Sequence, residues 1–333
     1  MRLRALPEDF VVEEIPLYEP AGEGEHTFVH VRKRLRNSEE VATALAHAAG
    51  ARPRDVGCAG RKDRMAVTSQ WFSVPGLDPR AALALTIPGV EILAAIPHLH
   101  KLRTGQLSGN RFAIRVRDLG PEDCERVAAG LDAMTTAGLP NRFGEQRFGR
   151  AGDNADRALA ILRGALRPRN RRHARFLLSA LQALVFNAVL DLRRRDGASS
   201  IDRLERGDIA WIHASRGQFL VEDPAREAPR AAAFEVSPTG PIFGTKMVAP
   251  GGEVAEREAR VLEAWGIDVG ALQLPRGIQL RGTRRPLRVR PEEARTEPTD
   301  DGLWLHFALP PGSYATVLVE ELSAPLGEPD RDS

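Results

Sequence analysis

The order of strand-like and helix-like segments along the chain constrains its fold more than any other feature. Apolar and polar residues alternate at residues 10–12 and 27–31, which predicts two strands near the start. From Gly138 onward the pattern changes to an arginine-rich, mostly helical stretch, whose longest predicted helix covers about residues 174–194. Residues 303–309 then alternate with a strict period of two, as a strand does. We therefore predict that this late strand rejoins the first sheet and that a second domain is inserted between the two parts of the first.

Other local signals place further elements in the first domain. Asn37, with Glu40 three residues later, forms a capping-box pattern at the start of a predicted helix that Gly50 ends. The remaining predicted elements are strands at residues 56–59, 66–74 and 112–116, a polar turn at residues 60–64 and a helix at residues 121–137. The first domain therefore mixes strands with helices.

The composition indicates a folded protein of a reducing compartment. The 333 residues are 42% hydrophobic and 28% charged, which is ordinary for a globular protein with a core. No run of 18 apolar residues occurs, and the start, MRLRALPEDF, lacks the apolar segment of a signal peptide. Cys58 and Cys124 are the only cysteines and lie in different segments, which argues against disulfides and a zinc site. We expect a cytoplasmic monomer that does not contact membranes.

The net charge of +2 conceals two basic clusters. Of the 47 basic residues 43 are arginines, whose planar guanidinium groups suit phosphate. Residues 142–175 contain ten arginines and three acidic residues, and residues 281–290 contain five arginines. Such clusters attract a polyanion, although solvated helix faces and loops have the same appearance.

Most familiar catalytic and cofactor motifs are missing. The chain has no Walker loop, no complete G-x-G-x-x-G, no H-E-x-x-H and no G-x-S-x-G. His98 and His100 could face one side of a strand, but they lack a third ligand. We therefore expect no metal ion, no cofactor and no serine nucleophile.

Asp63 is the most informative ionisable residue, because it lies in the predicted turn and is flanked by Arg61, Lys62 and Arg64. Neighbouring cations favour the ionised form of a carboxylate. An ionised carboxylate beside phosphate-binding groups can attack a sugar or base carbon without a cofactor. Taken alone, the same residues would also suit an exposed charged turn.

Six segments, in order, resemble the motifs of one enzyme family. They are residues 8–12 (EDFVV), 60–70 (GRKDRMAVTSQ), 107–112 (LSGNRF), 140–149 (PNRFGEQRFG), 178–187 (LSALQALVFN) and 309–316 (LPPGSYAT). In these segments the chain is similar to the TruD family of tRNA pseudouridine synthases. The resemblance implies an α+β catalytic domain with a mixed, largely antiparallel sheet, formed by residues 1–137 and 289–333. It also implies a mostly helical, TruD-specific insertion domain of residues 138–288.

The resemblance implies roles for four residues. Asp63 matches the nucleophilic aspartate of pseudouridine synthases, and Phe10, Asn110 and Tyr314 match positions that contact the target uridine. An enzyme acting on a base inside folded RNA must flip it out, and aromatic rings and amides suit the flipped base. Without the resemblance, Phe10 would be a core residue, Asn110 a turn residue and Tyr314 the start of a strand. Tyr314 stands where the family often has Phe, and Arg4 where it often has Lys.

The resemblance also implies the reaction and the partner. The family converts uridine 13 in the D arm of tRNA into pseudouridine by cleaving the glycosidic bond, rotating the base and rejoining it through carbon 5. Asp63 would attack the ribose or the base, or start a glycal route. We expect tRNA in a cleft between the domains, where arginines contact phosphates, so binding should weaken with salt. The alternatives are a non-catalytic tRNA-binding protein or RNA chaperone on the same scaffold, and a carboxylate-based nucleoside or RNA hydrolase.

Overall fold

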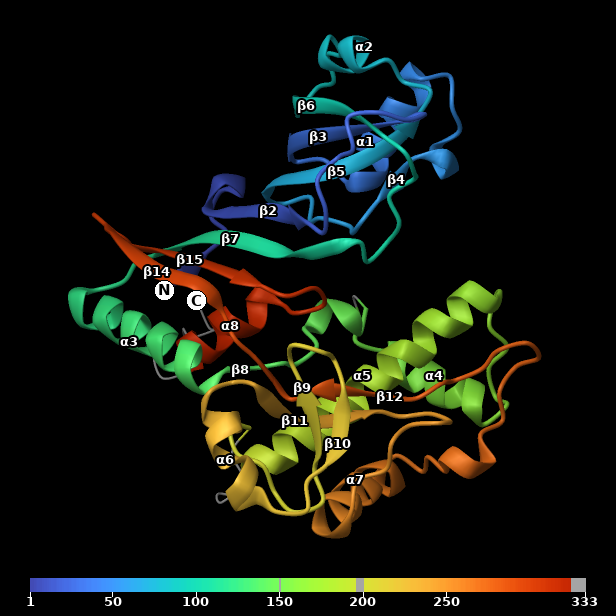
Figure 1. The fold of residues 1–333 in the computed structure, drawn as a ribbon, viewed down its shortest axis with the longest axis vertical. Helices are drawn as coiled ribbons and strands as arrows, with labels where there is room; N and C mark the ends of the chain where they lie inside the picture. Colours follow the sequence, from blue (N-terminus) through green and yellow to red (C-terminus); the bar gives the residue numbers. More distant parts are fainter. Residues whose placement is uncertain (150, 196–200, 325–333) are drawn as a thin grey trace. The chain divides into compact units, whose positions relative to one another are not determined.

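The computed structural model describes residues 1–149, 151–195 and 201–324, which belong to two compact units (Figure 1). Among the described residues, the first unit contains Met1–Asp132, Pro291–Gly312, Ser323 and Ala324. The second contains Ala133–Arg290 and Ser313–Leu322. Helix α3 (Pro121–Ala137) begins in the first unit and ends in the second.

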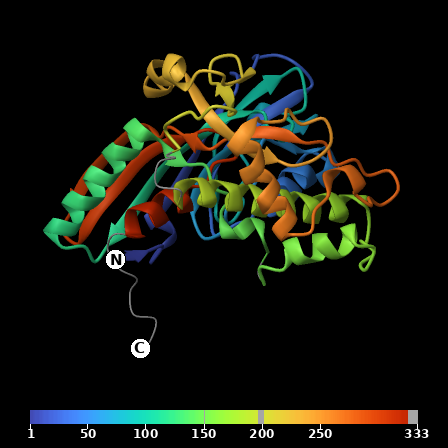
Figure 2. The ribbon, with the colours of Figure 1, turned by 90° about the horizontal axis from the view of Figure 1, so that it is seen from below.

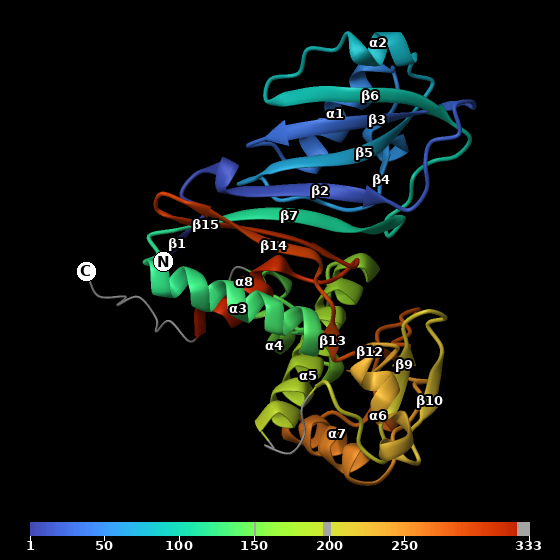
Figure 3. The same cartoon turned by 60° about the vertical axis from the view of Figure 1, so that its left-hand side comes forward.

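The first unit is built on one mixed sheet of nine strands. Seven strands follow the order β14-β15-β7-β2-β5-β3-β6, while β1 adds to β7 and β4 adds to β5 (Figure 3). Among the described strands of this sheet, the β2–β5 pair alone is parallel. The strands are β1 (Arg2–Leu3), β2 (Phe10–Pro16), β3 (His26–Arg34), β4 (Gly57–Cys58), β5 (Val67–Pro75), β6 (Val90–His98), β7 (Leu107–Arg117), β14 (Glu292–Thr299) and β15 (Gly302–Leu309).

Strand β15 carries the period-two pattern near the end of the chain. It pairs antiparallel with β7 along its whole length, from Gly302 opposite Arg117 to Leu309 opposite Asn110. Its alternate apolar residues are buried because they point into the core from one face of the sheet. The prediction that the late strand rejoins the first sheet is confirmed.

Helices α1 (Ser38–Ala48) and α2 (Pro79–Leu83) cover one face of this sheet. The start of α1 is the predicted capping box, in which Glu40 accepts a hydrogen bond from the backbone N of Asn37 at 3.0 Å. Val41 and Leu45 of α1 pack into a buried cluster with Phe72 of β5. Two 3-10 helices, η1 (Pro7–Asp9) and η2 (Pro53–Asp55), complete the unit.

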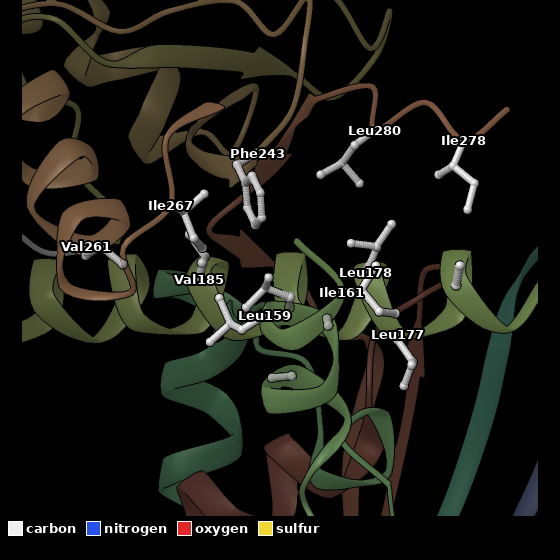
Figure 4. Close-up of a cluster of buried hydrophobic side chains, with 14 of the residues drawn as sticks. Leu159, Ile161, Leu177, Leu178, Val185, Phe243, Val261, Ile267, Ile278 and Leu280 are labelled. Atoms are coloured by element: carbon white, nitrogen blue, oxygen red, sulfur yellow. The ribbon is translucent and has the colours of Figure 1, made fainter. Parts of the chain in front are cut away.

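The second unit surrounds the long helix α5 (Arg171–Arg195). Helix α4 (Asn154–Leu162) lies along α5 (Figure 2), and α7 (Gly252–Ala264) also packs on it. By length and composition α5 could cross a membrane, but 61% of its most apolar window is buried inside the protein. It is therefore the core helix of this unit, and Phe243 packs against it in a buried apolar cluster (Figure 4).

A four-stranded sheet of order β10-β9-β11-β12 completes the second unit, and the sequence patterns do not predict it. Strand β11 (Val236–Ile242) is buried although it contains Pro238 and Pro241, which lack a backbone N–H and argue against an interior strand. The other elements are β8 (Leu139–Pro140), which pairs with β13 (Arg288–Val289), β9 (Ile209–Ile212), β10 (Gln218–Leu220), β12 (Thr283–Pro286), α6 (Pro224–Ala232), α8 (Ala315–Ser323), η3 (Glu145–Arg147) and η4 (Val269–Ala271).

Truncating Phe243 should destabilise the second unit. Its side chain is 0% exposed, so Phe243→Ala removes buried contacts and leaves a cavity, at a cost of about 3–5 kcal/mol of unfolding free energy. Phe176→Ala is the matched control, because Phe176 is 46% exposed on α5 and its loss should cost less than about 1 kcal/mol. Urea unfolding of both variants measures the difference, and equal losses would contradict this packing.

Candidate active site

Asp63 lies in the loop between β4 and β5, where the sequence places it. Its side chain is 48% exposed, so a substrate can reach the carboxylate from solvent. Arg4 Nη2 lies 3.7 Å from Asp63 Oδ2. The carboxylate is thus open on one side and faces a guanidinium on the other.

The three cations beside Asp63 in the sequence make other contacts. Their partners are Glu39 for Arg61, Glu14 for Lys62 and the backbone carbonyl of Leu35 for Arg64. Among the residues that the structure describes, the ion pair of the Asp63 carboxylate is with Arg4. The Asp63 carboxylate therefore pairs with a residue distant in sequence, because side chains next to one another in a loop point in different directions.

A buried lysine, Lys33 of β3, holds the backbone of the Asp63 loop. Its Nζ donates to the carbonyls of Arg36 at 2.8 Å, Lys62 at 3.3 Å and Asp63 at 2.8 Å. An ammonium group has three N–H donors, so all of them are used here. Lys33 is 1% exposed, and this burial lowers the pKa of its ammonium group to about 8. Protonated Lys33 therefore fixes the position from which the Asp63 side chain projects.

A chain of hydrogen bonds from α1 to β5 holds the other part of this loop. Ser38 Oγ, in the first turn of α1, donates to Gln70 Oε1 at 2.7 Å and accepts from the backbone N of Lys62 at 3.0 Å. Gln70 Nε2 donates to the carbonyl of Gly60 at 3.0 Å. Ser38 and Gln70 are buried, so these bonds are shielded from competition with water. They restrict the backbone between residues 60 and 62.

A buried ion pair completes the support of the loop. Lys62 Nζ lies 2.7 Å from Glu14 Oε2, with side chains that are 7% and 1% exposed. The second carboxylate oxygen, Glu14 Oε1, accepts from the backbone N of Trp71 at 3.2 Å. Both charges are therefore paired, which is what allows them to be buried.

Arg4 contacts both Phe10 and Asp63. The guanidinium carbon of Arg4 lies 4.0 Å from the centroid of the Phe10 ring, in cation–π geometry. Phe10 is only 5% exposed, and its ring also meets Phe112 edge-on at 6.3 Å. Arg4 has a φ of 53°, which is uncommon for a residue other than glycine. The arginine thus covers the aromatic ring while it contacts the carboxylate.

The segment before Phe10 is anchored by a second charge pair. Asp9 is 1% exposed and lies 2.7 Å from Arg117 of β7. Hydrogen bonding from Arg117 lowers the pKa of the Asp9 carboxyl. Asp9 also accepts from the backbone N of Leu6 at 3.0 Å, so it holds the stretch that presents Arg4.

Asn110 lies on β7 directly opposite Glu14 of β2. Residues opposite one another in an antiparallel pair point to the same face of the sheet, so Asn110 is on the face that carries the Glu14 ion pair. Its Oδ1 is buried and has no hydrogen-bond partner among the described residues. An unpaired buried acceptor costs about 1–3 kcal/mol, and a hydrogen-bond donor from outside the protein would remove this cost.

Tyr314 belongs to the second unit. Its ring centroid lies 6.1 Å from that of Phe143, and a Cβ at Gly144 would lie 3.1 Å from Tyr314 Cδ1. Phe143 is held in turn by Asn187, which accepts from its N and donates to its O, both at 2.9 Å. Tyr314 therefore packs against the segment PNRFGEQRFG, and its contact with a uridine stays a prediction.

Sequence reasoning missed Lys33 and Glu14. In each strand, the two preceding residues at every second position are apolar and buried. Lys33 and Glu14 continue this spacing, so their side chains point toward the core. A charged residue in phase with a buried face predicts a paired internal charge. That signal could have found both residues.

The described residues offer neither a metal-binding cluster nor an activated thiol. Within residues 1–149, 151–195 and 201–324, no group of three or more His, Cys, Asp or Glu side chains is placed to hold a metal ion. Cys58 and Cys124 are free thiols, and burial raises the pKa of each.

Comparison with known proteins gives one consistent result. A family model described as tRNA pseudouridine synthase D (TruD) matches residues 1–157 and 155–322. A protein named tRNA pseudouridine synthase D from Geobacter metallireducens is 38% identical over 391 residues, covering 98% of this chain and 96% of the relative. Relatives of the same name from Anaeromyxobacter dehalogenans and Thermus thermophilus are 46% and 42% identical; each alignment covers 96% of this chain, and 92% and 88% of those relatives.

The fold has a counterpart among solved structures. A crystal structure described as tRNA pseudouridine synthase D (TruD) from Methanosarcina mazei superposes with a TM-score of 0.74 at 21% identity. It covers 96% of this chain and 93% of that one. The α+β class with a large mixed sheet is therefore confirmed.

Removing Glu14 should destabilise the first unit, because it would leave the Lys62 ammonium buried without a partner. Breaking a buried pair in this way costs about 3–5 kcal/mol, so Glu14→Leu should lower the unfolding free energy by roughly that amount. The double variant Glu14→Leu/Lys62→Met should recover much of the loss. Glu91→Leu is the control, since the Arg32–Glu91 pair is 55% and 61% exposed and should contribute little. Similar destabilisation by Glu14→Leu and Glu91→Leu in urea unfolding would contradict a buried pair.

Proposed function

Because the chain belongs to the tRNA pseudouridine synthase D (TruD) family and is therefore a tRNA-modifying isomerase, we propose that Asp63 is its catalytic carboxylate and uridine 13 of tRNA its target. The observation that carries the proposal is the half-exposed Asp63 carboxylate on a loop whose backbone is fixed by buried groups. Catalysis favours a reacting group that is open to substrate but held in one position.

The proposed reaction is a rearrangement within one nucleotide. The bond between ribose carbon 1′ and uracil N1 breaks, the base rotates, and carbon 1′ joins carbon 5. The proton on carbon 5 leaves and N1 gains a proton, so atoms and charge balance without an oxidant, reductant or cofactor. The Asp63 carboxylate would attack the ribose or the base, or remove a ribose proton on a glycal route.

Arg4 is the proposed positioning residue for Asp63. Its guanidinium lies 3.7 Å from the carboxylate, so it restrains the position of the Asp63 side chain. Arg4 also lies on the ring of Phe10. A flipped uracil would either displace Arg4 from this ring or stack on the guanidinium itself, since planar guanidinium groups also stack on bases.

Asn110 is proposed to recognise the edge of the uracil. Uracil presents an N3–H donor between two carbonyl acceptors, and an amide can pair with both kinds of group. The buried Asn110 Oδ1, which lacks a partner among the described residues, would accept from N3–H. Tyr314 is proposed to contact the same uridine through its ring, and Phe10 to line the site.

The domain limits and the setting of the protein are part of the proposal. We assign residues 1–137 and 289–333 to the catalytic domain and residues 138–288 to the insertion, which contains helices α4 to α7 and also the sheet of β9 to β12. We also propose that the protein is a cytoplasmic monomer. Its arginines would bind tRNA phosphates, and the two basic clusters of the sequence support this contact.

Replacing the Asp63 carboxylate should abolish isomerisation. Asp63→Asn keeps the size of the side chain but removes the nucleophile, so the rate should fall by more than about 1,000-fold while tRNA binding persists. Carbodiimide treatment of tRNA followed by primer extension detects pseudouridine at position 13. Asp300→Asn, which changes an exposed turn residue, should retain wild-type activity.

Other outcomes of this experiment would separate the alternatives. Full activity of Asp63→Asn would refute the proposed role of the carboxylate. Wild-type protein that binds tRNA but forms no pseudouridine would indicate a non-catalytic RNA-binding protein. Release of free uracil would indicate a hydrolase.

The isomerisation rate should fall as pH rises through about 8, because Lys33 loses a proton in that range. Burial lowers the Lys33 pKa to about 8, so the side chain is charged below this pH and neutral above it. A neutral amine has two N–H donors for the three carbonyls, so the loop that carries Asp63 loosens. The charged groups facing Lys33 are Asp63, Lys62, Glu39 and Glu40.

Single-turnover rates between about pH 6 and pH 10 test this dependence. Lys33→Met does not titrate, so it should be slower than wild type at pH 7 and should lack the decline near pH 8. Lys246→Met, which alters an exposed lysine of the second unit, should retain the wild-type profile. The same decline in Lys33→Met would assign the titration to another group.

A further inference from the structure

A cavity of about 490 Å³ lies in the second unit, between α5 and residues 277–281. This is within the size range of pockets that bind small organic ligands. Its lining residues are Arg175, Leu178, Gln182, Gly277, Ile278, Gln279, Leu280 and Arg281. The reaction proposed above does not use any of them.

The floor of this cavity is apolar. Leu178, Ile278 and Leu280 are between 1% and 6% exposed and belong to the buried cluster around α5. Figure 4 shows Leu178 projecting from α5 toward Leu280, with Ile278 beside it on the opposite segment. An apolar surface of this kind suits the face of a nucleobase.

The lining of the cavity also contains two amide side chains. Gln182 is 8% exposed, and its Nε2 donates to the backbone carbonyl of Phe243 at 2.7 Å, which fixes the orientation of its amide. Its Oε1 has no hydrogen-bond partner among the described residues. Gln279 supplies a second amide from the facing segment. Amides of this kind bind the donors and acceptors at the edge of a base.

Two arginines lie on opposite walls. Arg175 comes from the first basic cluster of the sequence and Arg281 from the second, so the fold joins the two clusters at one cavity. Within the described part of the chain, neither has an ion pair with a carboxylate. The two stretches of sequence that form the walls contain no acidic residues. Residues 157–190 and 269–291 have no Asp or Glu, and together they have 13 arginines. This charge favours an anionic ligand.

The wall formed by residues 277–281 is held in place. The backbone N of Thr245 donates to the carbonyl of Leu280 at 2.8 Å, and the backbone N of Gly282 donates to the carbonyl of Thr245 at 2.8 Å. A Cβ at Gly244 would lie 2.4 Å from the Leu280 carbonyl oxygen, so the two segments approach as closely as backbone allows. Backbone contacts therefore fix this wall of the cavity.

We propose that this cavity binds one nucleotide of the RNA substrate, unstacked from its neighbours. Its base lies on Leu178 and Leu280 with its edge toward Gln182, and its phosphate contacts Arg175 and Arg281. The exposed ring of Phe176, next to Arg175 on α5, offers a stacking surface for an adjacent nucleotide. This inference extends the proposed function, because it takes the ligand to be the tRNA whose uridine is modified elsewhere on the protein.

Two variants separate a nucleotide pocket from a merely basic surface. Arg175→Gln/Arg281→Gln removes the phosphate contacts, and Gln279→Trp fills the cavity without changing any charge. All three residues are exposed, so both variants should fold, which thermal unfolding verifies. Arg226→Gln, an exposed arginine of α6 that does not line the cavity, is the matched control.

Each variant is assayed for binding of an unmodified tRNA transcript, for its salt dependence and for isomerisation. The arginine variant should weaken binding roughly 10- to 100-fold, as expected for lost charged hydrogen bonds. The slope of log affinity against log salt concentration should become shallower. The change should match the loss of about one phosphate contact. Gln279→Trp should weaken binding with an unchanged salt slope. For both variants, the rate at saturating tRNA should equal that of wild type, and Arg226→Gln should match wild type throughout.

Three results would overturn the proposal. Weaker binding in the arginine variant with wild-type binding in Gln279→Trp would show surface charge without a pocket. Wild-type binding in both variants would show that the RNA does not use the cavity. Binding of free uridine monophosphate that Gln279→Trp abolishes, together with unchanged tRNA affinity, would assign the pocket to a free nucleotide. Failure of the proposed function is separate, because it appears as absence of pseudouridine with the wild-type protein.

Discussion

The candidate site depends on paired charges that the sheet buries beneath a loop. Lys33 binds three backbone carbonyls around Asp63, and the Glu14–Lys62 pair ties the same loop to β2. Burying an isolated ammonium or carboxylate is costly, whereas burying it with all its hydrogen bonds made is tolerated and enforces one geometry. These buried charges therefore hold in one position the loop that carries the half-exposed Asp63 carboxylate.

Arg4 connects the Asp63 loop to the aromatic ring of Phe10. Its guanidinium contacts both the Phe10 ring and the Asp63 carboxylate, so one side chain links two residues that are proposed to meet the uridine. The unpaired Asn110 Oδ1 lies on the face of the sheet that also carries Glu14. A flipped base is read by stacking on aromatic or apolar side chains and by hydrogen bonds to its edge, which Phe10 and Asn110 are proposed to supply.

The sequence predicts those elements in which apolar residues recur at a regular spacing. Strand β15 and helix α5 are in this class, because each buries a regular set of side chains. The edge strands β14 and β6 were not predicted, since an edge strand is covered on fewer sides and β14 is largely charged and exposed. Strand β11 was missed because its prolines are typical of a loop. Asp63 was predicted from its sequence motif. Its contact with Arg4 was not predicted, because the two residues are far apart in sequence and no local pattern indicates that they meet.

A structure of the protein bound to an unmodified tRNA would test the central claim most directly. With the Asp63→Asn variant used to stop the reaction, carbon 1′ or the base of uridine 13 should lie within about 3.5 Å of the side chain at position 63, out of the RNA stack. A uridine 13 that stays stacked in the RNA, with no pyrimidine at the loop of residues 60–64, would contradict the account.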